Sequence, residues 1–291
     1  MTSTQAPVGR LVVCPTPIGN LEDVTLRVLA ALREADVVAC EDTRHTRVLL
    51  DRHGISTRLL SLHEHNERAR AAEMVARIRE GAMVALVSDA GTPLVSDPGF
   101  ALVRACLAQG SPVHVLPGPS AALAGLVASG LPAAHWRFVG FLPRKRPELE
   151  RLLMHASETI VAFESARRLA RVLSVLATLD PARAVAVCRE LTKLHEEVRR
   201  GSAAELAAVY EAKPPRGEIV LVVGAAAPGA ARRGEAREAL RKLVEAGARP
   251  RRAASVIAGL TGVAANELYR ELTGAEGELS GAEGELTGAG Q

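Results

Sequence analysis

Aromatic residues are scarce in this sequence, which holds four Phe, two Tyr and one Trp among 291 residues. The core must therefore be built from Val, Leu, Ile and Ala. Hydrophobic residues make up 48% of the chain and charged residues 24%, as in most globular proteins. This composition favours α/β or all-α packing over an aromatic-rich β-sandwich. The length is more typical of two domains than of one.

Paired cysteines are also lacking. Cys14, Cys40, Cys106 and Cys188 lie far apart, each in or beside an apolar run, and no CxxC pair occurs. This pattern indicates neither a zinc knuckle nor a redox motif. We expect buried free thiols, which suit a reducing cytosol. The sequence has no hydrophobic signal core at its start and no apolar run of membrane-spanning length, so we expect a cytoplasmic protein without a membrane partner.

Several common signatures of chemistry are missing. The sequence has no GxxxxGK[ST] phosphate loop, no GxGxxG after its first apolar run and no GxSxG nucleophile elbow. His63 and His65 would share a face of an extended segment, but no third ligand accompanies them, so we expect no metal site. None of these motifs therefore assigns a reaction to the chain.

Short apolar runs alternate with helical periodicity in the first part of the chain. The helical segments are Thr25–Glu34, Arg68–Glu80 and Phe100–Gln109. The expected strands are Leu11–Cys14, Val37–Cys40, Met83–Ser88 and Val113–Leu116. Alternation of strand and helix predicts a parallel sheet covered by helices, in an α/β domain over residues 1–118.

A second series of strands follows a helix of small residues, Ala121–Ser129, which Gly130 and Pro132 close. The expected strands are Phe138–Phe141, Ile160–Phe163, Ala184–Cys188 and Glu218–Val223, with a helix at Arg167–Leu179. We place a boundary near Gly118–Leu131 and predict a second α/β domain over residues 119–226. The fold class is therefore α/β, with two domains and mostly parallel sheets.

An Ala- and Gly-rich linker, Ala225–Gly234, precedes a small helical module over residues 235–272. Basic residues outnumber acidic ones between Arg232 and Arg252. Arg251 and Arg252 are therefore either part of a phosphate-contacting patch or part of a solvated helical face. The repeats of residues 273–291 are rich in Gly and Glu, so we expect that tail to be disordered.

Polar loops follow the expected strands, and ligands bind at the carboxyl ends of parallel strands. Residues 41–46 read EDTRHT directly after a buried run. Capping of a helix by Asp42 or Thr43 is one explanation. Six consecutive polar residues exceed what capping needs, so we favour a functional loop in which Arg44 suits a phosphate.

Further loops of this kind follow the later strands. Small residues and glycine at 88–93 (SDAGTP) and at 96–99 (SDPG) let a ligand reach the backbone, and Asp89 could accept a hydrogen bond from a ribose or amino group. The alternative is a pair of turns formed by these two strings. The start of the Ala121 helix offers free backbone N–H groups. We expect these loops to face, across a cleft, the segments at Phe163, at Arg189–Lys193 and at Gly217.

A resemblance now becomes visible in the order of these strings. TPIGNLED, CEDTRHT, SLHEHNE, VALVSDAGTPLVSDPG, LPGPSAAL, SGLP, GFLPRK, RELTKLHEE and GEIVLVV occur in sequence. Together they closely resemble the ribosomal RNA small-subunit methyltransferase I family of the tetrapyrrole methylase superfamily. The likeness runs from about Leu11 to Val223. The C-terminal helices also resemble that family's terminal module.

The resemblance implies two α/β domains with S-adenosylmethionine bound between them, and a homodimer. It implies 2′-O-methylation of a cytidine in the decoding region of small-subunit (16S) ribosomal RNA, on naked RNA or on the 30S subunit. Carried over by position, the cofactor-binding residues are Ser88, Asp89, Ala90, Gly91, Thr92, Ser120, Ala121, Phe163 and Gly217.

Methyl transfer from a sulfonium needs alignment of the nucleophile but no metal, whereas a ribose hydroxyl benefits from a general base. Our candidates for this base are Glu41, His45 and Glu190. Arg44, Arg189 and Lys193 are candidates for phosphate contacts, together with Arg251 and Arg252. Two other functions remain open: methylation of a corrin precursor, and a non-catalytic RNA-binding role in ribosome assembly.

Overall fold

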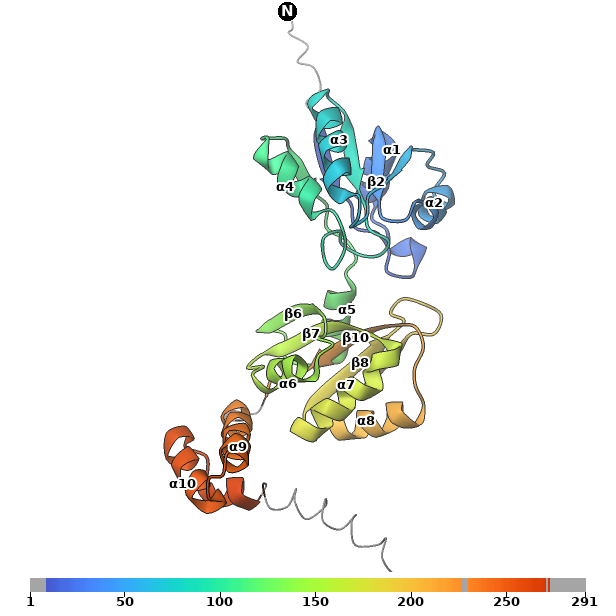
Figure 1. Cartoon of the computed structure of the whole chain (residues 1–291). Helices are drawn as coiled ribbons and strands as arrows, with labels where there is room; N and C mark the ends of the chain where they lie inside the picture. Colours follow the sequence, from blue (N-terminus) through green and yellow to red (C-terminus); the bar gives the residue numbers. More distant parts are fainter. Residues whose placement is uncertain (1–8, 227–229, 271, 273–291) are drawn as a thin grey trace, which may run out of the picture.

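The computed structural model describes residues 9–226, 230–270 and 272, which form two sheets and a C-terminal pair of helices (Figure 1). The first sheet has the order β3-β2-β4-β1-β5, and every pair of neighbours is parallel. Its strands are β1 (Arg10–Val13), β2 (Val37–Cys40), β3 (Leu59–Ser61), β4 (Met83–Leu86) and β5 (Val113–Val115). The parallel sheet expected here is confirmed, and β3 is an additional strand.

Helices cover both faces of the first sheet: α1 (Leu26–Glu34), α2 (Thr43–Arg52), α3 (Glu67–Arg79) and α4 (Phe100–Ala108). Alternate residues of β1 point to opposite faces of the sheet and pack in two separate hydrophobic cores. Val12 packs in the core that contains α1, and Leu11 packs in the core that contains α3. Because both faces are covered, the central strands β2 and β4 are apolar and buried throughout, which explains their continuous hydrophobic runs.

The second sheet has the order β6-β7-β10-β8-β9. Its strands are β6 (Trp136–Phe141), β7 (Thr159–Ser165), β8 (Ala184–Arg189), β9 (Glu197–Ser202) and β10 (Glu218–Val223). Only β6 and β7 pair in parallel; the other three pairs are antiparallel. The α/β class is confirmed, but the expectation of parallel pairing is wrong for this sheet. β9 was not expected, and it pairs antiparallel with β8 after a short connection.

One helix covers the face of the second sheet that is turned toward the first sheet. This helix, α5 (Ala121–Ser129), lies at the junction of the two sheets (Figure 1) and contacts β7, β8 and β10. Gly125 permits the close approach, because a Cβ atom there would lie 2.6 Å from a methyl group of Val220. Three helices pack on the opposite face: α6 (Arg146–Met154), α7 (Ala166–Leu179) and α8 (Ala203–Ala212).

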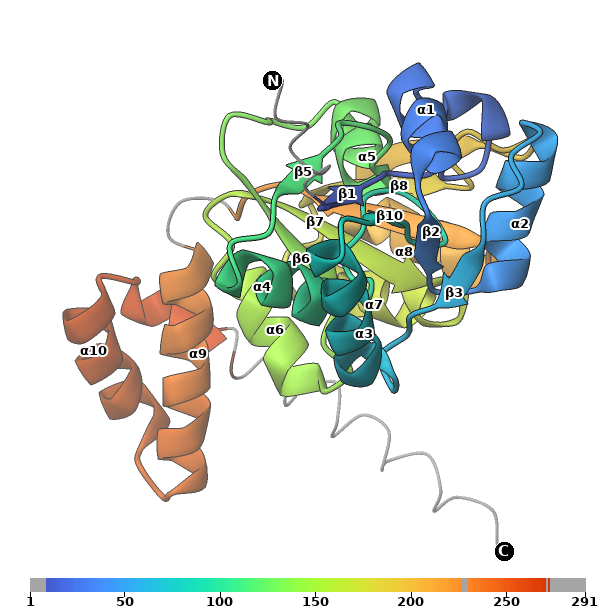
Figure 2. The ribbon, with the colours of Figure 1, turned by 90° about the horizontal axis from the view of Figure 1, so that it is seen from above.

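The C-terminal helices are α9 (Ala230–Glu245) and α10 (Pro250–Thr261), followed by a helical segment over residues 265–270. They share a small core that includes Leu240 and Ile257, and they lie to one side of the sheets (Figure 2). The helical stretches expected here are therefore present, whereas the expected disordered tail lies outside the described residues. No described helix has the length and hydrophobicity needed to span a bilayer.

Candidate active site

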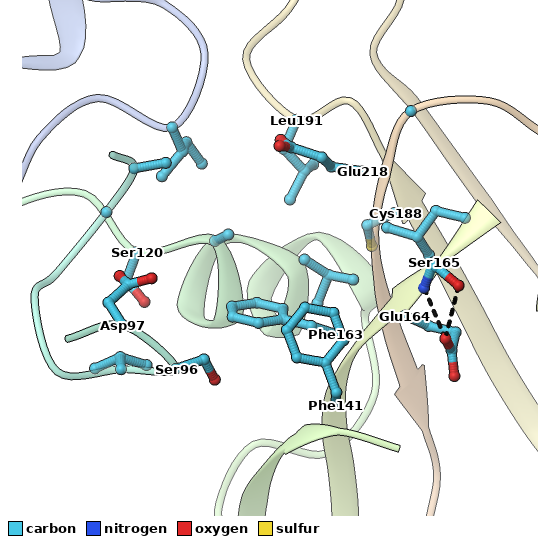
Figure 3. Close-up of a pocket in the computed structure, with 18 of the residues that line it drawn as sticks. Ser96, Asp97, Ser120, Phe141, Phe163, Glu164, Ser165, Cys188, Leu191 and Glu218 are labelled. Carbon is cyan, nitrogen blue, oxygen red and sulfur yellow. Dashed lines mark hydrogen bonds between the residues drawn. The ribbon is translucent and has the colours of Figure 1, made fainter. Parts of the chain in front are cut away.

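A cleft of about 640 Å³ lies where the loops at the carboxyl end of the first sheet meet the second sheet (Figure 3). From the first sheet's loops and the start of α5, its lining includes Ala90, Gly91, Thr92, Asp97, Ser120 and Ala121. From the second sheet and α7 it includes Phe141, Phe163, Glu164, Arg167, Gly217 and Glu218. Most positions that we expected to bind a cofactor therefore line one cleft; Ser88 and Asp89 do not.

Backbone contacts fix the loop after β4. Thr16 and Gly91 form a bridge in which each amide donates to the other's carbonyl, at 2.8 and 3.0 Å. Gly91 has a φ of +78°, a conformation that glycine adopts without strain. The buried Ser88 hydroxyl donates to the Gly91 carbonyl at 3.3 Å, and the Thr92 hydroxyl donates to the Pro119 carbonyl at 3.1 Å. This wall is rigid and small, so a ligand can reach its backbone.

The amino-terminal end of α5 opens into the same cleft. Ser120 caps the helix, and its hydroxyl accepts from the Leu123 amide at 3.4 Å. Ala121 and Ala122 belong to the first turn, where amides have no partner within the helix. These N–H groups and the positive end of the helix dipole suit a polar or anionic ligand group.

The opposite wall of the cleft is aromatic. Phe163 packs edge-to-face against Phe138, with ring centroids 4.9 Å apart, and against Phe141 at 5.8 Å. Phe141 and Phe163 project into the cleft (Figure 3), and Phe141 is 60% exposed. In a chain with so few aromatics, this cluster provides apolar ring faces on which a planar ligand ring can stack.

Backbone strain gathers in two loops that border the cleft. In the described part of the chain, four residues other than glycine have positive φ: Leu94 and Ser96 after β4, and Glu190 and Thr192 after β8. Such conformations cost roughly 1–3 kcal/mol each and persist where the surroundings impose them. Their pairing on the two sides of one cleft is typical of a functional site.

The Glu190 side chain is held in a network of hydrogen bonds beside the cleft. Its Oε1 accepts from the Lys193 ammonium at 3.0 Å and from the Glu218 amide at 2.9 Å. These contacts, first the Glu218 backbone and then Lys193, lower the pKa of Glu190. Gly217 makes room for it, because a Cβ atom there would lie 2.5 Å from the Glu190 carboxyl carbon. Glu190 and Lys193 thus bind each other, and Glu190 orders the loop.

The EDTRHT segment is not the loop that we expected. α2 begins at Thr43, and Asp42 is its N-cap, accepting from the Arg44 amide at 2.8 Å. The Arg44 guanidinium also donates to Asp42 at 2.8 Å and lowers the pKa of that carboxyl to about 2. Capping explains more of this segment than we allowed, and Arg44 lies on the exposed first turn of α2.

A smaller hollow of about 240 Å³ adjoins the cleft and shares Ala90 with it. This hollow is lined by four residues that the sequence predicted for the site and that the main cleft lacks: His45, Ser88, Asp89 and Lys193. Asp89 accepts from the Asp42 amide at 3.0 Å, which ties the first turn of α2 to the loop after β4.

Glu41 lies at the end of β2 and lines neither cavity. Burial, followed by the nearby Asp89 carboxylate, raises the pKa of Glu41 above its ordinary value. Of the carboxylates Glu41, Asp89 and Asp97, only that of Asp97 belongs to a residue that lines the main cleft.

The remaining predicted cations have partners or lie elsewhere. Arg189 pairs with Glu197 at 3.1 Å. Arg251 and Arg252 are exposed at the start of α10, and the Arg251 guanidinium stacks over Tyr269 at 5.2 Å. These two arginines therefore belong to the C-terminal helices and are absent from the cleft lining.

Sequence reasoning missed two charged residues of the cleft, Asp97 and Arg167. Asp97 lies in the SDPG string, whose side chains we gave no role, and Arg167 lies in the first turn of α7. Burial raises the pKa of Asp97 to about 6, with repulsion from Glu41 and Asp89 adding to the effect. A second carboxylate-bearing turn next to SDAGT was the available signal.

Metal binding has no structural support in the described part of the chain. No group of three or more His, Cys, Asp or Glu side chains there could hold a metal ion. The rings of His63 and His65 stand 6.0 Å apart, as an isolated pair. The four cysteines are free and buried, as expected, and burial raises the pKa of Cys188 in the cleft to about 11.

Comparison with known proteins places this site in a family. Residues 10–207 match the family model described as Tetrapyrrole (Corrin/Porphyrin) Methylases. A protein of Mesorhizobium japonicum named ribosomal RNA small subunit methyltransferase I is 47% identical, covering 90% of this chain and 90% of its own. The protein of the same name from Escherichia coli O157:H7 is 42% identical, covering 90% and 94%.

Solved structures of related fold agree with this match. Uroporphyrin-III C-methyltransferase of Thermus thermophilus has a TM-score of 0.55 and is 27% identical, covering 74% of this chain and 94% of its own. The methyltransferase CobJ has a TM-score of 0.57 at 26% identity, covering 75% and 95%. The sequence identity of the first group is much higher, and it extends over the C-terminal helices. The chain therefore belongs to the ribosomal RNA small subunit methyltransferase I family of the tetrapyrrole methylases.

Proposed function

We propose that this protein transfers the methyl group of S-adenosylmethionine to a ribose 2′-hydroxyl of a cytidine in small-subunit ribosomal RNA. The observation that carries this proposal is the 47% identity to a ribosomal RNA small subunit methyltransferase I along 90% of both chains. The uroporphyrin-III C-methyltransferase and the methyltransferase CobJ are less similar, and their matches cover about three quarters of this chain.

The cleft has the properties that S-adenosylmethionine requires. Its volume lies in the usual range for small-molecule sites, roughly 300–1,000 Å³. Phe163 and Phe141 offer a stacking surface for the adenine ring, and the first turn of α5 offers N–H groups for the carboxylate. The bound sulfonium supplies an already activated methyl carbon. The protein must therefore align the acceptor oxygen with the C–S bond and remove its proton.

RNA contacts are proposed for the surface around the cleft and for the C-terminal helices. His45 and Lys193 line the hollow beside the cleft, where the target nucleotide would enter. Arg251 and Arg252 stand exposed at the start of α10, where they can meet phosphates of a more distant RNA segment. The family relationship further supports the homodimer, and exposed Leu123 and Val127 on α5 offer apolar surface for it.

Methyl transfer to defined substrates tests the function. The full chain is incubated with labelled S-adenosylmethionine and, separately, with 30S subunits, with naked 16S RNA and with a corrin precursor. We expect label only in RNA, and mass mapping should place it on the ribose of one cytidine. Label in the corrin precursor would favour the tetrapyrrole reaction. RNA binding without transfer would favour an assembly factor.

A further inference from the structure

Three acidic residues are among those that line the main cleft in the described part of the chain: Asp97, Glu164 and Glu218. Glu164 is buried and bound, since its Oε1 accepts from the Ser165 amide at 2.7 Å and its Oε2 lies 3.2 Å from Arg168. Glu218 is 76% exposed and pairs with Lys193 at 2.8 Å. Asp97 has no ion pair among the described residues, and its hydrogen bond with Ser88 leaves carboxylate lone pairs for a ligand.

The backbone holds Asp97 at a fixed place in the cleft. It follows Ser96, whose φ is +70°, and precedes Gly99, whose φ is +124°. The Glu67 carboxylate accepts from the Gly99 amide at 2.9 Å, which anchors the end of this segment to α3. In the view of Figure 3, Asp97 lies on the same side as Ser120, and Glu164 and Ser165 lie on the opposite side. Asp97 therefore shares the cleft with the start of α5 and with the aromatic wall.

Burial, with a smaller contribution from nearby carboxylates, makes Asp97 a better proton acceptor than an ordinary aspartate. Burial is the main cause of its raised pKa of about 6, and the Glu41 and Asp89 carboxylates add to it, while Ser88 opposes it by hydrogen bonding. From the second sheet and α7, the groups that line the opposite side are Glu164, Arg167 and Glu218. A base with a pKa near the working pH is ionised and still accepts a proton readily.

We propose that Asp97 is the general base that takes the proton of the ribose 2′-hydroxyl. This inference rests on the proposed function. In the step, an Asp97 carboxylate oxygen takes the hydroxyl proton while the 2′-oxygen forms a bond to the methyl carbon. The C–S bond breaks, and its electron pair stays on sulfur, which leaves as the neutral thioether of S-adenosylhomocysteine. Asp97 then releases its proton to water, so charge and atoms balance.

This assignment differs from the bases that the sequence suggested. The pKa of Glu190 is lowered by its contacts with the Glu218 backbone and Lys193, which makes it a weak base. Glu41 lies outside the lining of both cavities, and His45 lines only the smaller hollow. Asp97 alone among these four lines the cleft that fits the methyl donor.

The test compares the wild-type chain with Asp97→Asn, with Asp97→Glu and with Asp51→Asn, which changes an exposed aspartate of α2. Single-turnover methylation of 30S subunits is measured at saturating S-adenosylmethionine from about pH 5 to 9. Calorimetry measures the binding of S-adenosylhomocysteine. We expect Asp97→Asn to lower the rate by about 10²–10⁴-fold, to lose the acidic limb of the pH profile and to keep its affinity for S-adenosylhomocysteine.

Asp97→Glu should retain part of the methylation rate, and the acidic limb of its pH–rate profile should shift. Asp51→Asn should behave as the wild type. An Asp97→Asn rate within a few-fold of the wild type would overturn the inference. So would an unchanged acidic limb, or a rate loss fully matched by lost S-adenosylhomocysteine affinity. A wild-type chain that methylates no RNA would overturn the proposed function as well, which separates the two failures.

Discussion

Asp97 should make the folded protein less stable at neutral pH than it would be with a neutral side chain of the same shape. Its pKa is raised from 3.8 to about 6, chiefly by burial, so the fold favours the protonated acid. The stabilisation from that protonated form is complete below about pH 3.8 and is lost as the pH rises through 6. Asparagine is neutral at every pH and escapes this loss.

The pKa values set the size of the effect. At 1.36 kcal/mol for each pKa unit, the change from 3.8 to about 6 gives a ceiling of about 3 kcal/mol above pH 6. Asp97 is only partly buried, and water at the mouth of the cleft reduces the penalty, so we expect about 1 kcal/mol. For a chain of this length, that corresponds to a rise in Tm of roughly 2 °C.

Thermal melts of the wild type and Asp97→Asn from about pH 4 to 8 measure this difference. We expect the variant to melt higher at pH 8 and the two curves to converge toward pH 4. A difference that does not depend on pH would refute the reasoning, because it would show that packing and not ionisation separates the two proteins. If Asp97→Asn is more stable but less active than the wild type, the wild type retains an aspartate that lowers its stability because activity requires it.

Three further predictions concern the walls of the site and the C-terminal helices. Gly217→Ala should unfold at lower denaturant concentration, by about 2 kcal/mol, because φ is +91° and the new Cβ meets Glu190; an unchanged midpoint would contradict this. Phe163→Leu should weaken S-adenosylhomocysteine binding by about tenfold in calorimetry through lost stacking, unless the adenine lies elsewhere. The double variant Arg251→Ala, Arg252→Ala should lose about two phosphate contacts, so the plot of log RNA affinity against log salt concentration should become less steep by about two. An unchanged slope would show that these helices do not contact the RNA.

Hydrophobic patterning was enough to predict four of the five strands of the first sheet, and it is clearest in β2 and β4, which are apolar and buried throughout. Val37–Cys40 is buried at every position and was located to the residue. β9 shows the limit of this signal. Its sequence, EVRRGS, is polar and half exposed at a sheet edge, so only its pairing with β8 makes it a strand. The antiparallel order of the second sheet depends on such pairing and could not be predicted locally.

The candidate site was predicted in its backbone loops and less well in its side chains. Glycine and small residues at 90–92 indicated a ligand-facing loop, because their chemistry is local. The fate of Glu190 depends on Glu218, 28 positions away, whose amide donates to it. The raised pKa of Asp97 similarly depends on its burial and, to a smaller extent, on Glu41, which follows β2. Contacts between distant segments decide which carboxylate is held and which is available, and one sequence does not contain them.

The division of the chain into folding units at 1–118, 119–226 and 235–272 remains a prediction, as do the cytoplasmic location and the homodimer. Limited proteolysis with mass spectrometry tests the division, since cuts should concentrate at the boundaries. Equilibrium sedimentation of the wild type and of Val127→Glu tests the dimer, because Val127 is 80% exposed on α5.

The most direct test of the account is calorimetric titration of S-adenosylhomocysteine into the wild type, Ala121→Phe and Val127→Phe. Ala121 lines the cleft at the start of α5, whereas Val127 is exposed on the same helix and absent from the cleft lining. The account predicts one binding site per chain in the wild type and in Val127→Phe, and none in Ala121→Phe. No heat of binding in the wild type, or equal binding in Ala121→Phe, would contradict it.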